Sequence, residues 1–425
     1  MSIVDDLNKI NNIKNEIKYA IRDKGVEMKD DTPFAEYPNR IRDIETGGGD
    51  DRYDEGYNDG RDFGYNEGYA DGINAGSGGD PFYEDFYNMK TDNGTNMAGL
   101  FSGYAGTELD VSNLDTSNVT NMEKMFQYCR QLGKLDTSNF NTKNVTNMNN
   151  MFNGCNNLTE LNVSKWDISK VENMDNMFRG CSNLTKLDVS NFNTSNVRNM
   201  NRMFWDCSNL TELNLSNFNT VNVEEMNGMF HTCSNLTSLD LSNFNTGSVR
   251  NMNDMFWDCS SLETLNLSNW VINTNINNMF WGCNNLKTLD LSNWVINNTD
   301  VNNMFRDCSN LEALNLSNWA IDNLYVGGMF WGCDNLRSLY LVGCSNETIS
   351  KIINDSNLPT GTWEGKTRII FCREEDRGDL EAPDGWEFSY KDDDGGDDGG
   401  DNPDDGGDDG GDDGGDDGGG NLGEE

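Results

Sequence analysis

The apolar positions between residues 96 and 341 form a repeat, and the stretch from Val197 to Phe218 is a representative unit. Its first half spaces apolar side chains at helical intervals that share one face: Val197, Met200, Met203, Phe204 and Cys207. Its second half, Leu213-Asn214-Leu215-Ser216, alternates apolar and polar residues, which is typical of a short strand with one buried face. Each unit is therefore predicted to form a short helix, a turn and a short strand.

A cysteine marks the step of the repeat, which is 26 residues at first and 24 or 25 later. The marker residues are Cys129, Cys155, Cys181, Cys207, Cys233, Cys259, Cys283, Cys308 and Cys333. A fixed period in this range predicts an α/β solenoid, because one unit cannot bury its own apolar face and stacked copies can. Strands stacked about 4.8 Å apart would give roughly ten coils over about 50 Å.

Stacking turns each repeated position into a ladder that runs along the solenoid. We expect a leucine ladder from Leu135 to Leu339 and an aromatic ladder from Phe140 to Trp319. An asparagine ladder, interrupted by Lys165, is expected to pair with backbone groups that the turns leave without partners. The solenoid with its N-terminal cap is assigned to residues 80–343, and a C-terminal cap to residues 344–390.

The remaining segments differ in composition from the repeat. Residues 1–46 are predicted to form a helical module, whose amphipathic helix either packs within the module or oligomerises as a short coil. Residues 47–79 carry Gly and Tyr at four-residue steps, which fits either an inter-chain helical stalk or a flexible spacer. Residues 391–425 repeat Asp-Asp-Gly-Gly and are predicted to be a disordered acidic tail.

The net charge of −41 argues against nucleic acid and anionic membranes as partners, because both are negatively charged. No apolar run is long enough to span a bilayer, so membrane insertion is not expected. The stretch from Met1 to Leu7 has neither the basic nor the apolar region of a conventional signal peptide.

The cysteines favour a buried, reduced ladder over disulfides, because Cys packs as a small hydrophobe and every marker lies among core residues. A single histidine and the lack of a C-x-x-C motif make a zinc site unexpected, and no cofactor or metal is predicted. Cys344 and Cys372 lie outside the ladder, and they either pair in an oxidising compartment or stay free.

The residue that follows each Met-Phe pair is expected to point away from the core. We call this row the ridge, and its candidate ligand-binding members are Arg179, Trp205, His231, Trp257, Trp281, Arg306 and Trp331. Exposed Trp and Arg dominate binding hot spots, and aromatic faces stack on ring-shaped ligands. The alternative is a purely structural stack between coils. His231 has no nucleophile or base beside it in the pattern, so a non-enzymatic protein is predicted.

The repeat motif L-x-L-S-N-F-N-T-x-N-V-x-N-M-x-x-M-F-x-x-C-S-N-L resembles the BspA-like leucine-rich-repeat surface proteins of the DUF285 type. This resemblance implies adhesion or surface recognition. The stretch N-N-I-K-N-E-I-K-Y-A-I-R-D-K-G-V-E-M-K-D-D-T-P-F-A-E-Y is similar to an N-terminal module of tail-fibre and virion proteins from phages of gut bacteria, which implies attachment to virion structural proteins.

Two functions follow from these resemblances. The first is a phage virion appendage, a fibre or decoration protein synthesised in the host cytoplasm, whose solenoid recognises a host-surface glycan or protein. The alternative is a bacterial BspA-like adhesin at the cell surface or secreted. The repetition of the unit suits weak multivalent contacts in either case.

Overall fold

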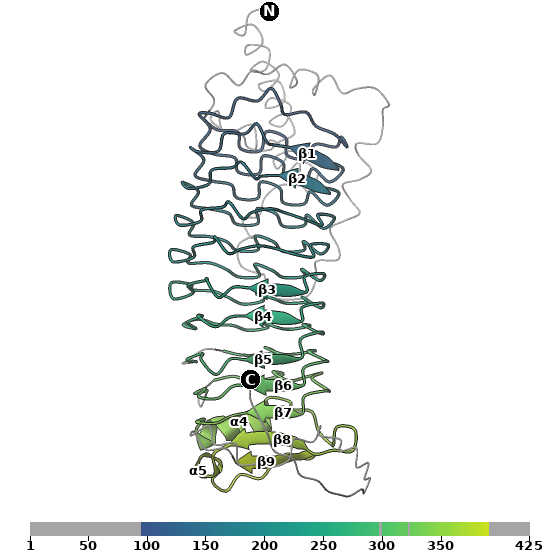
Figure 1. The fold of residues 1–425 in the computed structure, drawn as a ribbon, viewed down its shortest axis with the longest axis vertical. Helices are drawn as coiled ribbons and strands as arrows, with labels where there is room; N and C mark the ends of the chain where they lie inside the picture. Colours follow the sequence, from purple (N-terminus) through teal and green to yellow (C-terminus); the bar gives the residue numbers. More distant parts are fainter. Residues whose placement is uncertain (1–94, 297–299, 322–323, 391–425) are drawn as a thin grey trace, which may run out of the picture.

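The computed structural model describes residues 95–296, 300–321 and 324–390. These residues form a solenoid whose coils stack along the long axis of the molecule (Figure 1). The predicted helical module (1–46), stalk or spacer (47–79) and acidic tail (391–425) lie outside the described residues, as does the start of the N-terminal cap, residues 80–94. The expected number of coils stays a prediction.

Short parallel strands lie one below another on one side of the solenoid (Figure 1). They are β1 (Lys134–Asp136), β2 (Glu160–Asn162), β3 (Ser238–Asp240), β4 (Thr264–Asn266), β5 (Thr288–Asp290), β6 (Ala313–Asn315) and β7 (Ser338–Tyr340). The register pairs leucine with leucine in successive coils, as in Leu135 with Leu161 and Leu314 with Leu339. The central leucine of each strand points into the core and its neighbours point outward, as the alternating pattern predicts.

The helix predicted for the Met-Phe half of each unit is wrong, because this half is a run of tight turns. Alternate backbone N–H groups donate to carbonyl groups of the next coil, at 2.7–2.9 Å in the first complete unit: Met122, Lys124, Phe126 and Tyr128. The N–H groups between them donate to the carbonyl three residues earlier: Met125, Gln127 and Cys129. Half of the backbone donors therefore join neighbouring coils, whereas an α-helix would direct them along its own axis.

Left-handed residues make this alternation possible. The third residue of two β-turns in every unit has a positive φ, which these turns require and which Gly and Asn adopt most readily. In the first turn these residues are Gly99, Lys124, Asn150, Asn176, Arg202, Gly228, Asp254, Asn278, Asn303 and Gly328. In the second turn they are Gly103, Tyr128, Gly154, Gly180, Asp206, Thr232, Asp258, Gly282, Asp307 and Gly332. The helical spacing of the apolar residues concealed this Gly, Asn and Asp signal.

The Gly180→Ala substitution is expected to lower the free energy of unfolding by about 1–2 kcal/mol. Gly180 has a φ of +71°, whereas the nearest atoms to an added Cβ lie 3.5 Å away, so the cost comes from the backbone and not from crowding. Gly133→Ala is the matched control, because its added Cβ meets only one atom, at 3.8 Å, and its φ is not positive. Urea unfolding of both variants tests this, and equal midpoints would contradict it.

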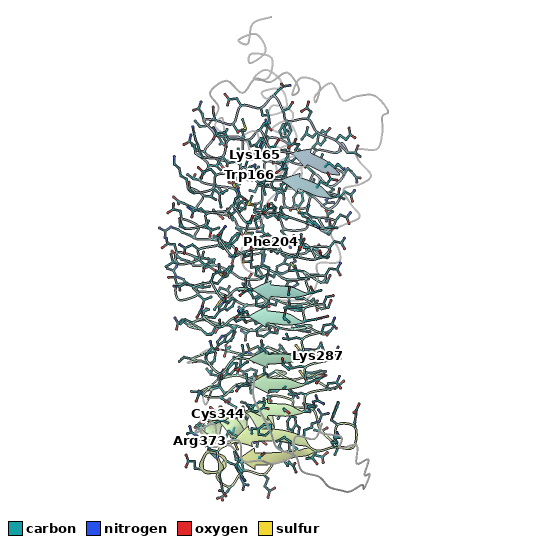
Figure 2. The ribbon with its side chains drawn as sticks, viewed as in Figure 1. Lys165, Trp166, Phe204, Lys287, Cys344 and Arg373 are labelled. Carbon is teal, nitrogen blue, oxygen red and sulfur yellow. The ribbon has the colours of Figure 1, made fainter. Side chains whose placement is uncertain are left out.

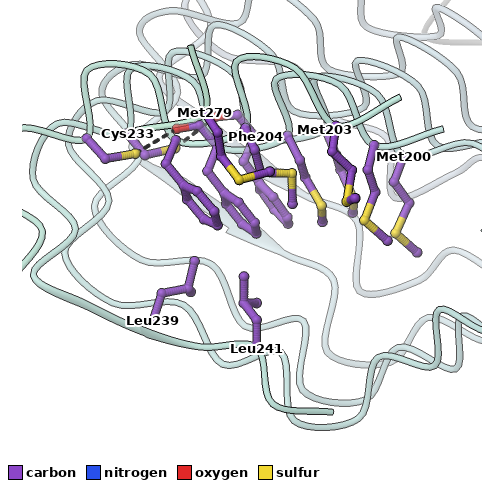
Figure 3. Packing of buried hydrophobic residues seen from close by; sticks show 14 of the residues in the cluster. Met200, Met203, Phe204, Cys233, Leu239, Leu241 and Met279 are labelled. Carbon is purple, nitrogen blue, oxygen red and sulfur yellow. Dashed lines mark hydrogen bonds between the residues drawn. The ribbon is translucent and has the colours of Figure 1, made fainter. Parts of the chain in front are cut away.

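The interior consists of stacked side chains from equivalent positions of the repeat (Figure 3). The phenylalanines of the Met-Phe pairs lie nearly parallel, with ring centroids 5.7 Å apart for Phe178 and Phe204 and 5.8 Å apart for Phe204 and Phe230. The ladder starts at Phe101, which stacks on Phe126 at 5.4 Å. A second aromatic ladder runs beside it, as in Phe192 and Phe218 at 6.4 Å.

The cysteine ladder is buried and reduced, as predicted. Each marker thiol donates to the carbonyl oxygen of the phenylalanine in the preceding coil, as Cys233 does to Phe204 at 3.1 Å (Figure 3). Burial raises the pKa of the Cys259 thiol to about 12, so the thiol keeps the proton that it donates. Cys344 and Cys372 are also buried free thiols.

The asparagine ladder pairs with the backbone as predicted. The side-chain amides of Asn139 and Asn191 donate to the carbonyl groups of Val111 and Trp166 in the preceding coil, both at 3.0 Å. Lys165, labelled beside Trp166 in Figure 2, replaces the asparagine in one coil. These bonds satisfy backbone acceptors where the chain turns out of each strand.

Residues 344–390 close the end of the solenoid with α4 (Asn346–Asp355), β8 (Arg368–Cys372), α5 (Glu374–Arg377) and β9 (Trp386–Tyr390). Strands β8 and β9 extend the parallel sheet beyond β7 and so cover its last repeat strand. Arg368 is buried and donates to the carbonyl oxygens of Gly361, Leu336 and Asp334. In the described part of the chain, no helix has the length and apolarity needed to cross a membrane.

Candidate functional site: a stacked ridge on the outer wall

The ridge residues lie at the second position of the second β-turn in each unit, so their side chains leave the core although the segment is not helical. The ridge side chains from Arg179 to Arg306 are half-buried between their neighbours. Trp331, the last of them, is 57% exposed. The turn geometry therefore explains the outward position that the sequence predicted.

The ridge forms one continuous stack of aromatic and cationic groups. Trp205 lies on His231 at 3.6 Å between ring centroids, and Trp257 lies on Trp281 at 4.3 Å. His231 and Trp257 are tilted by 34° at 5.2 Å, which joins the two pairs. The guanidinium of Arg179 covers Trp205 at 5.1 Å, and that of Arg306 lies between Trp281 and Trp331.

The Arg306 guanidinium carbon is 4.3 Å from the Trp281 centroid and 5.2 Å from the Trp331 centroid. At the other end of the aromatic series, the Arg179 guanidinium carbon is 5.1 Å from the Trp205 centroid. Each such cation–π contact stabilises by about 0.5–2 kcal/mol, more as the pair loses water. The stack is thus a real structural ladder, and it presents ring edges, rather than faces, to solvent at its centre.

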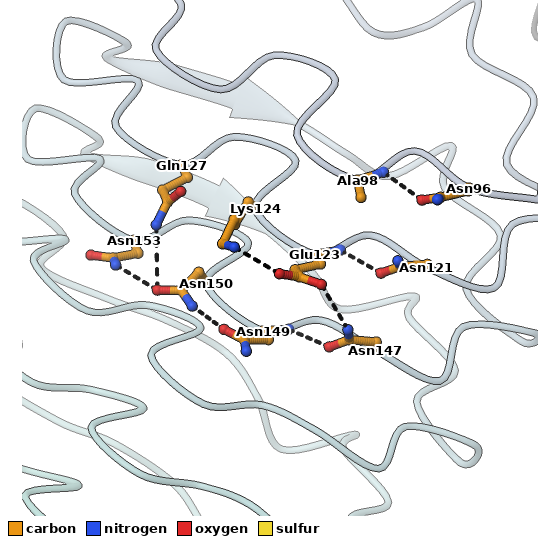
Figure 4. Close-up of polar contacts among 10 residues, drawn as sticks. All are labelled: Asn96, Ala98, Asn121, Glu123, Lys124, Gln127, Asn147, Asn149, Asn150 and Asn153. Atoms are coloured by element: carbon orange, nitrogen blue, oxygen red, sulfur yellow. Dashed lines mark hydrogen bonds and ion pairs between the residues drawn. The ribbon is translucent and has the colours of Figure 1, made fainter. Parts of the chain in front are cut away.

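The N-terminal end of the ridge consists of amides instead of rings (Figure 4). Gln127 and Asn153 both donate to the side-chain oxygen of Asn150, at 3.5 and 2.6 Å. The side chains of Asn121 and Asn147 accept from backbone N–H groups two residues later, at 3.0 Å, and fix the start of each turn. This end of the row is therefore occupied by its own hydrogen bonds.

Carboxylates flank the stacked rings. Burial raises the pKa values of Asp206 and Asp258, and the neighbouring Arg179 offsets part of this shift at Asp206. The indole N–H of Trp281 donates to Asp307 Oδ2 at 3.0 Å. These acidic residues adjoin the ridge because they hold the left-handed positions of the same turns. These acidic residues were not predicted as part of the site, although Gly or Asp precedes the marker cysteine in seven of the nine units.

His231 is a neutral stacking ring. Burial between the two indoles lowers its pKa to about 3, and the nearby Arg179 and Arg202 charges act in the same direction. Its Nδ1 lies 2.6 Å from Thr232 Oγ1. The ring therefore serves the stack as an uncharged aromatic group at physiological pH.

The His231→Trp variant is expected to lose part of the acid sensitivity of folding. The pKa of His231 is near 6.5 in the unfolded chain and about 3 in the folded chain. Between these pH values the unfolded chain binds one proton more than the folded chain, so acid favours unfolding. Wild-type stability should therefore fall, relative to the variant, by about 1 kcal/mol per pH unit between pH 6 and 4. Urea midpoints at pH 8, 6, 5 and 4 measure this gap, and a constant gap would disprove it.

A shallow cavity of about 420 Å³ lies where the ridge ends, lined by Trp331, Gly332, Asp334, Asn357, Leu358, Pro359, Thr360 and Arg368. Its walls come from the last repeat and from the chain that follows α4. Apart from Trp331, none of these residues was predicted from sequence as part of a site, since the cap has no repeat to reveal its register.

The polar face of the strands is a second outward surface, and its charges pair with one another. Lys134 contacts Glu160 at 2.6 Å, and Lys186 contacts Glu212 at 3.4 Å. Hydrogen bonds from the side chain and backbone of Ser190 lower the pKa of Asp188. Such mutual pairing fits a solvated face.

In the described residues, no group of three or more His, Cys, Asp or Glu side chains is placed to hold a metal ion. The stacked ridge and the cavity beside Trp331 are the features of this wall with the clearest geometry for contact with a ligand.

Comparison with known proteins identifies the class of the solenoid. A family model described as Mycoplasma protein of unknown function, DUF285, matches residues 77–137, 133–214 and 181–288. A model of the leucine-rich repeats of FBD-associated F-box protein At5g56370 matches residues 250–351. The protein is thus a leucine-rich-repeat solenoid. More particularly, its repeats from residue 77 to 288 are similar to those of the DUF285 family.

Among solved structures, the functional domain of InlJ from Listeria monocytogenes, which includes a cysteine ladder, is similar at 15% identity. The match covers 65% of this chain and 64% of that one, so it spans less than two thirds of the InlJ chain, and the TM-score is 0.19. No curated protein matches the chain.

Proposed function

We propose that the protein is a non-enzymatic adhesin, which a bacterium displays on its surface or secretes and which recognises a ligand on a host surface. The observation that carries this proposal is the ridge, in which Trp and Arg side chains are fixed in one row on the outer wall. Rigid aromatic and arginine side chains are the residues that contribute most to binding hot spots. The DUF285-type repeats support the same role through the resemblance to surface proteins.

Preorganisation is the physical advantage of such a wall. Trp257 and Trp281 are held by their neighbours before any ligand arrives, so little side-chain freedom is lost on binding. The repeat offers similar contacts at regular intervals, which favours an extended ligand such as a glycan chain or a fibrous protein.

The virion role depends on the resemblance of residues 1–46, which lie outside the described residues, and the matched families do not support it. Electron microscopy with a gold-labelled antibody against the solenoid distinguishes the adhesin role from the virion role. Labelling of intact bacterial cells is expected for the adhesin, whereas labelling restricted to phage particles would replace it with the virion appendage.

Adhesion itself is tested with fluorescent full-length protein on epithelial monolayers and mucin-coated plates. A Trp257→Ala, Trp281→Ala double variant is expected to bind at least about tenfold more weakly, because both side chains are central to the ridge. A Glu212→Ala, Asp240→Ala double variant on the strand face is the matched control and should bind like the wild type. Unchanged binding by a folded ridge variant, or no binding by the wild type, would overturn the proposal.

A further inference from the structure

The stack of ridge residues has an open end at Trp331. Rings or guanidinium groups lie on both sides of Trp205, His231, Trp257 and Trp281. Among the described residues, Arg306 is the only group that stacks on Trp331. The indole of Trp331 is also 57% exposed, so it is the ridge ring with the most surface left for a ligand.

The chain after α4 builds the rest of a binding site around this ring. The N–H of Phe330 donates to Ser356 O at 2.9 Å, as Phe305 does to Met329 in the coil before. This register places Leu358 beyond Trp331, in the layer where a repeat would supply another ridge side chain. The cavity of about 420 Å³ lies there, within the range of about 300–1,000 Å³ that holds small ligands.

The lining of the cavity combines one aromatic surface with polar groups at its rim. Asp334, Asn357 and Thr360 are exposed there and supply a carboxylate, an amide and a hydroxyl. The Asn357 side-chain oxygen accepts from Gly328 N–H at 3.0 Å, which holds the amide in place. The nearby Arg368 is buried and directs its donors to three backbone carbonyl oxygens instead of the cavity.

We propose that this cavity binds one neutral or basic sugar ring of a glycan, stacked on the indole of Trp331. A pyranose has an apolar C–H face that suits an aromatic surface, and hydroxyl groups at its edge that suit Asp334, Asn357 and Thr360. The inference deepens the proposed recognition function, on which it rests for the biological source of the glycan. The binding chemistry itself depends only on the cavity.

The charge around the cavity favours neutral and basic sugars over acidic ones. The cavity carries the carboxylate of Asp334, while the one guanidinium that lines it is engaged with backbone carbonyl oxygens. The chain as a whole has a net charge of −41. The carboxylate of Asp334 and the net negative charge of the chain therefore disfavour sialic and uronic acids, whereas a neutral hexose has no charge to be repelled and the ammonium group of a glucosamine ring is attracted by Asp334.

The test is saturation-transfer NMR of the full chain with methyl glucoside, methyl galactoside, N-acetylglucosamine and glucosamine, compared with sialic and glucuronic acids. At least one neutral or basic sugar should show transfer to its C–H face, and the acids should show none. Trp331→Ala is expected to weaken binding about tenfold or more, because the stacking surface is removed. Tyr325→Ala is the matched control, since Tyr325 is a 70% exposed aromatic residue outside the cavity.

An Asp334→Asn variant keeps the shape of the rim and removes its charge, so it should gain binding of the acidic sugars. The proposal is overturned by no transfer to any neutral or basic sugar, by equal transfer in Trp331→Ala, or by preference of the wild type for acids. These results are obtained on isolated protein and sugar. They stand apart from the adhesion assay, whose failure would leave sugar binding intact.

Discussion

Phe204→Ala should lower the free energy of unfolding by about 3–5 kcal/mol, the range for removing a fully buried phenylalanine ring. Phe204 has no exposed surface and lies between Phe178 and Phe230, so its loss leaves a cavity lined by two rigid rings. Its coil cannot collapse freely onto the gap, because backbone hydrogen bonds fix the spacing to the coils on either side.

Urea unfolding followed by tryptophan fluorescence measures this change. Val221→Ala is the control, since Val221 is 44% exposed and its truncation should alter stability by less than about 0.5 kcal/mol. Because each coil is stabilised by its neighbours, Phe204→Ala should also weaken the coupling between the coils on either side of it. The two halves of the solenoid should then unfold at different urea concentrations, which broadens the transition. A loss below about 1 kcal/mol would show that the phenylalanine ladder is not the main support of the fold.

Arg368→Met should be the most damaging change in the C-terminal cap, with an expected loss of about 3 kcal/mol or more. The guanidinium bonds to backbone carbonyl oxygens of Gly361, Leu336 and Asp334, and so ties the cap to the last repeat. Methionine fills similar volume but donates no hydrogen bond, so these acceptors would lose their partner in a buried place.

Lys366→Met provides the comparison, because Lys366 is exposed two residues away on the same segment. Thermal unfolding and limited proteolysis of both variants are the measurements. Early cleavage within residues 344–390 is expected only for Arg368→Met, and wild-type resistance in that variant would show that the cap is held by other contacts.

The repeat itself was readable from the sequence because the same residue types return at the same step. The buried cysteines, the paired leucines and the outward position of Trp205 or Trp281 follow from stacking, whatever the local backbone does. The backbone of the Met-Phe half was not readable in this way. Its apolar spacing fits a helix, whereas Asn150, Gly154 and their equivalents take left-handed turns that send alternate N–H groups to the next coil.

The site was only partly predictable for a related reason. A helical wheel shows that a side chain leaves the core, but ring-on-ring contact such as that of Trp205 with His231 depends on the distance between coils. The cavity beside Trp331 depends on where the chain goes after α4, outside the repeat. No periodic signal marks Asn357 or Thr360, so only the folded cap brings them together with Trp331.

The hydrogen bond from each cysteine to the coil before it has a consequence for how such genes change. Cys181 and Cys207 make the same contact with Phe152 and Phe178, so duplication or loss of one 26-residue segment rejoins equivalent partners. The molecule can thereby gain or lose length by recombination without a new core. Each event also inserts or deletes one ridge side chain, and so changes the order of ridge side chains that a partner contacts.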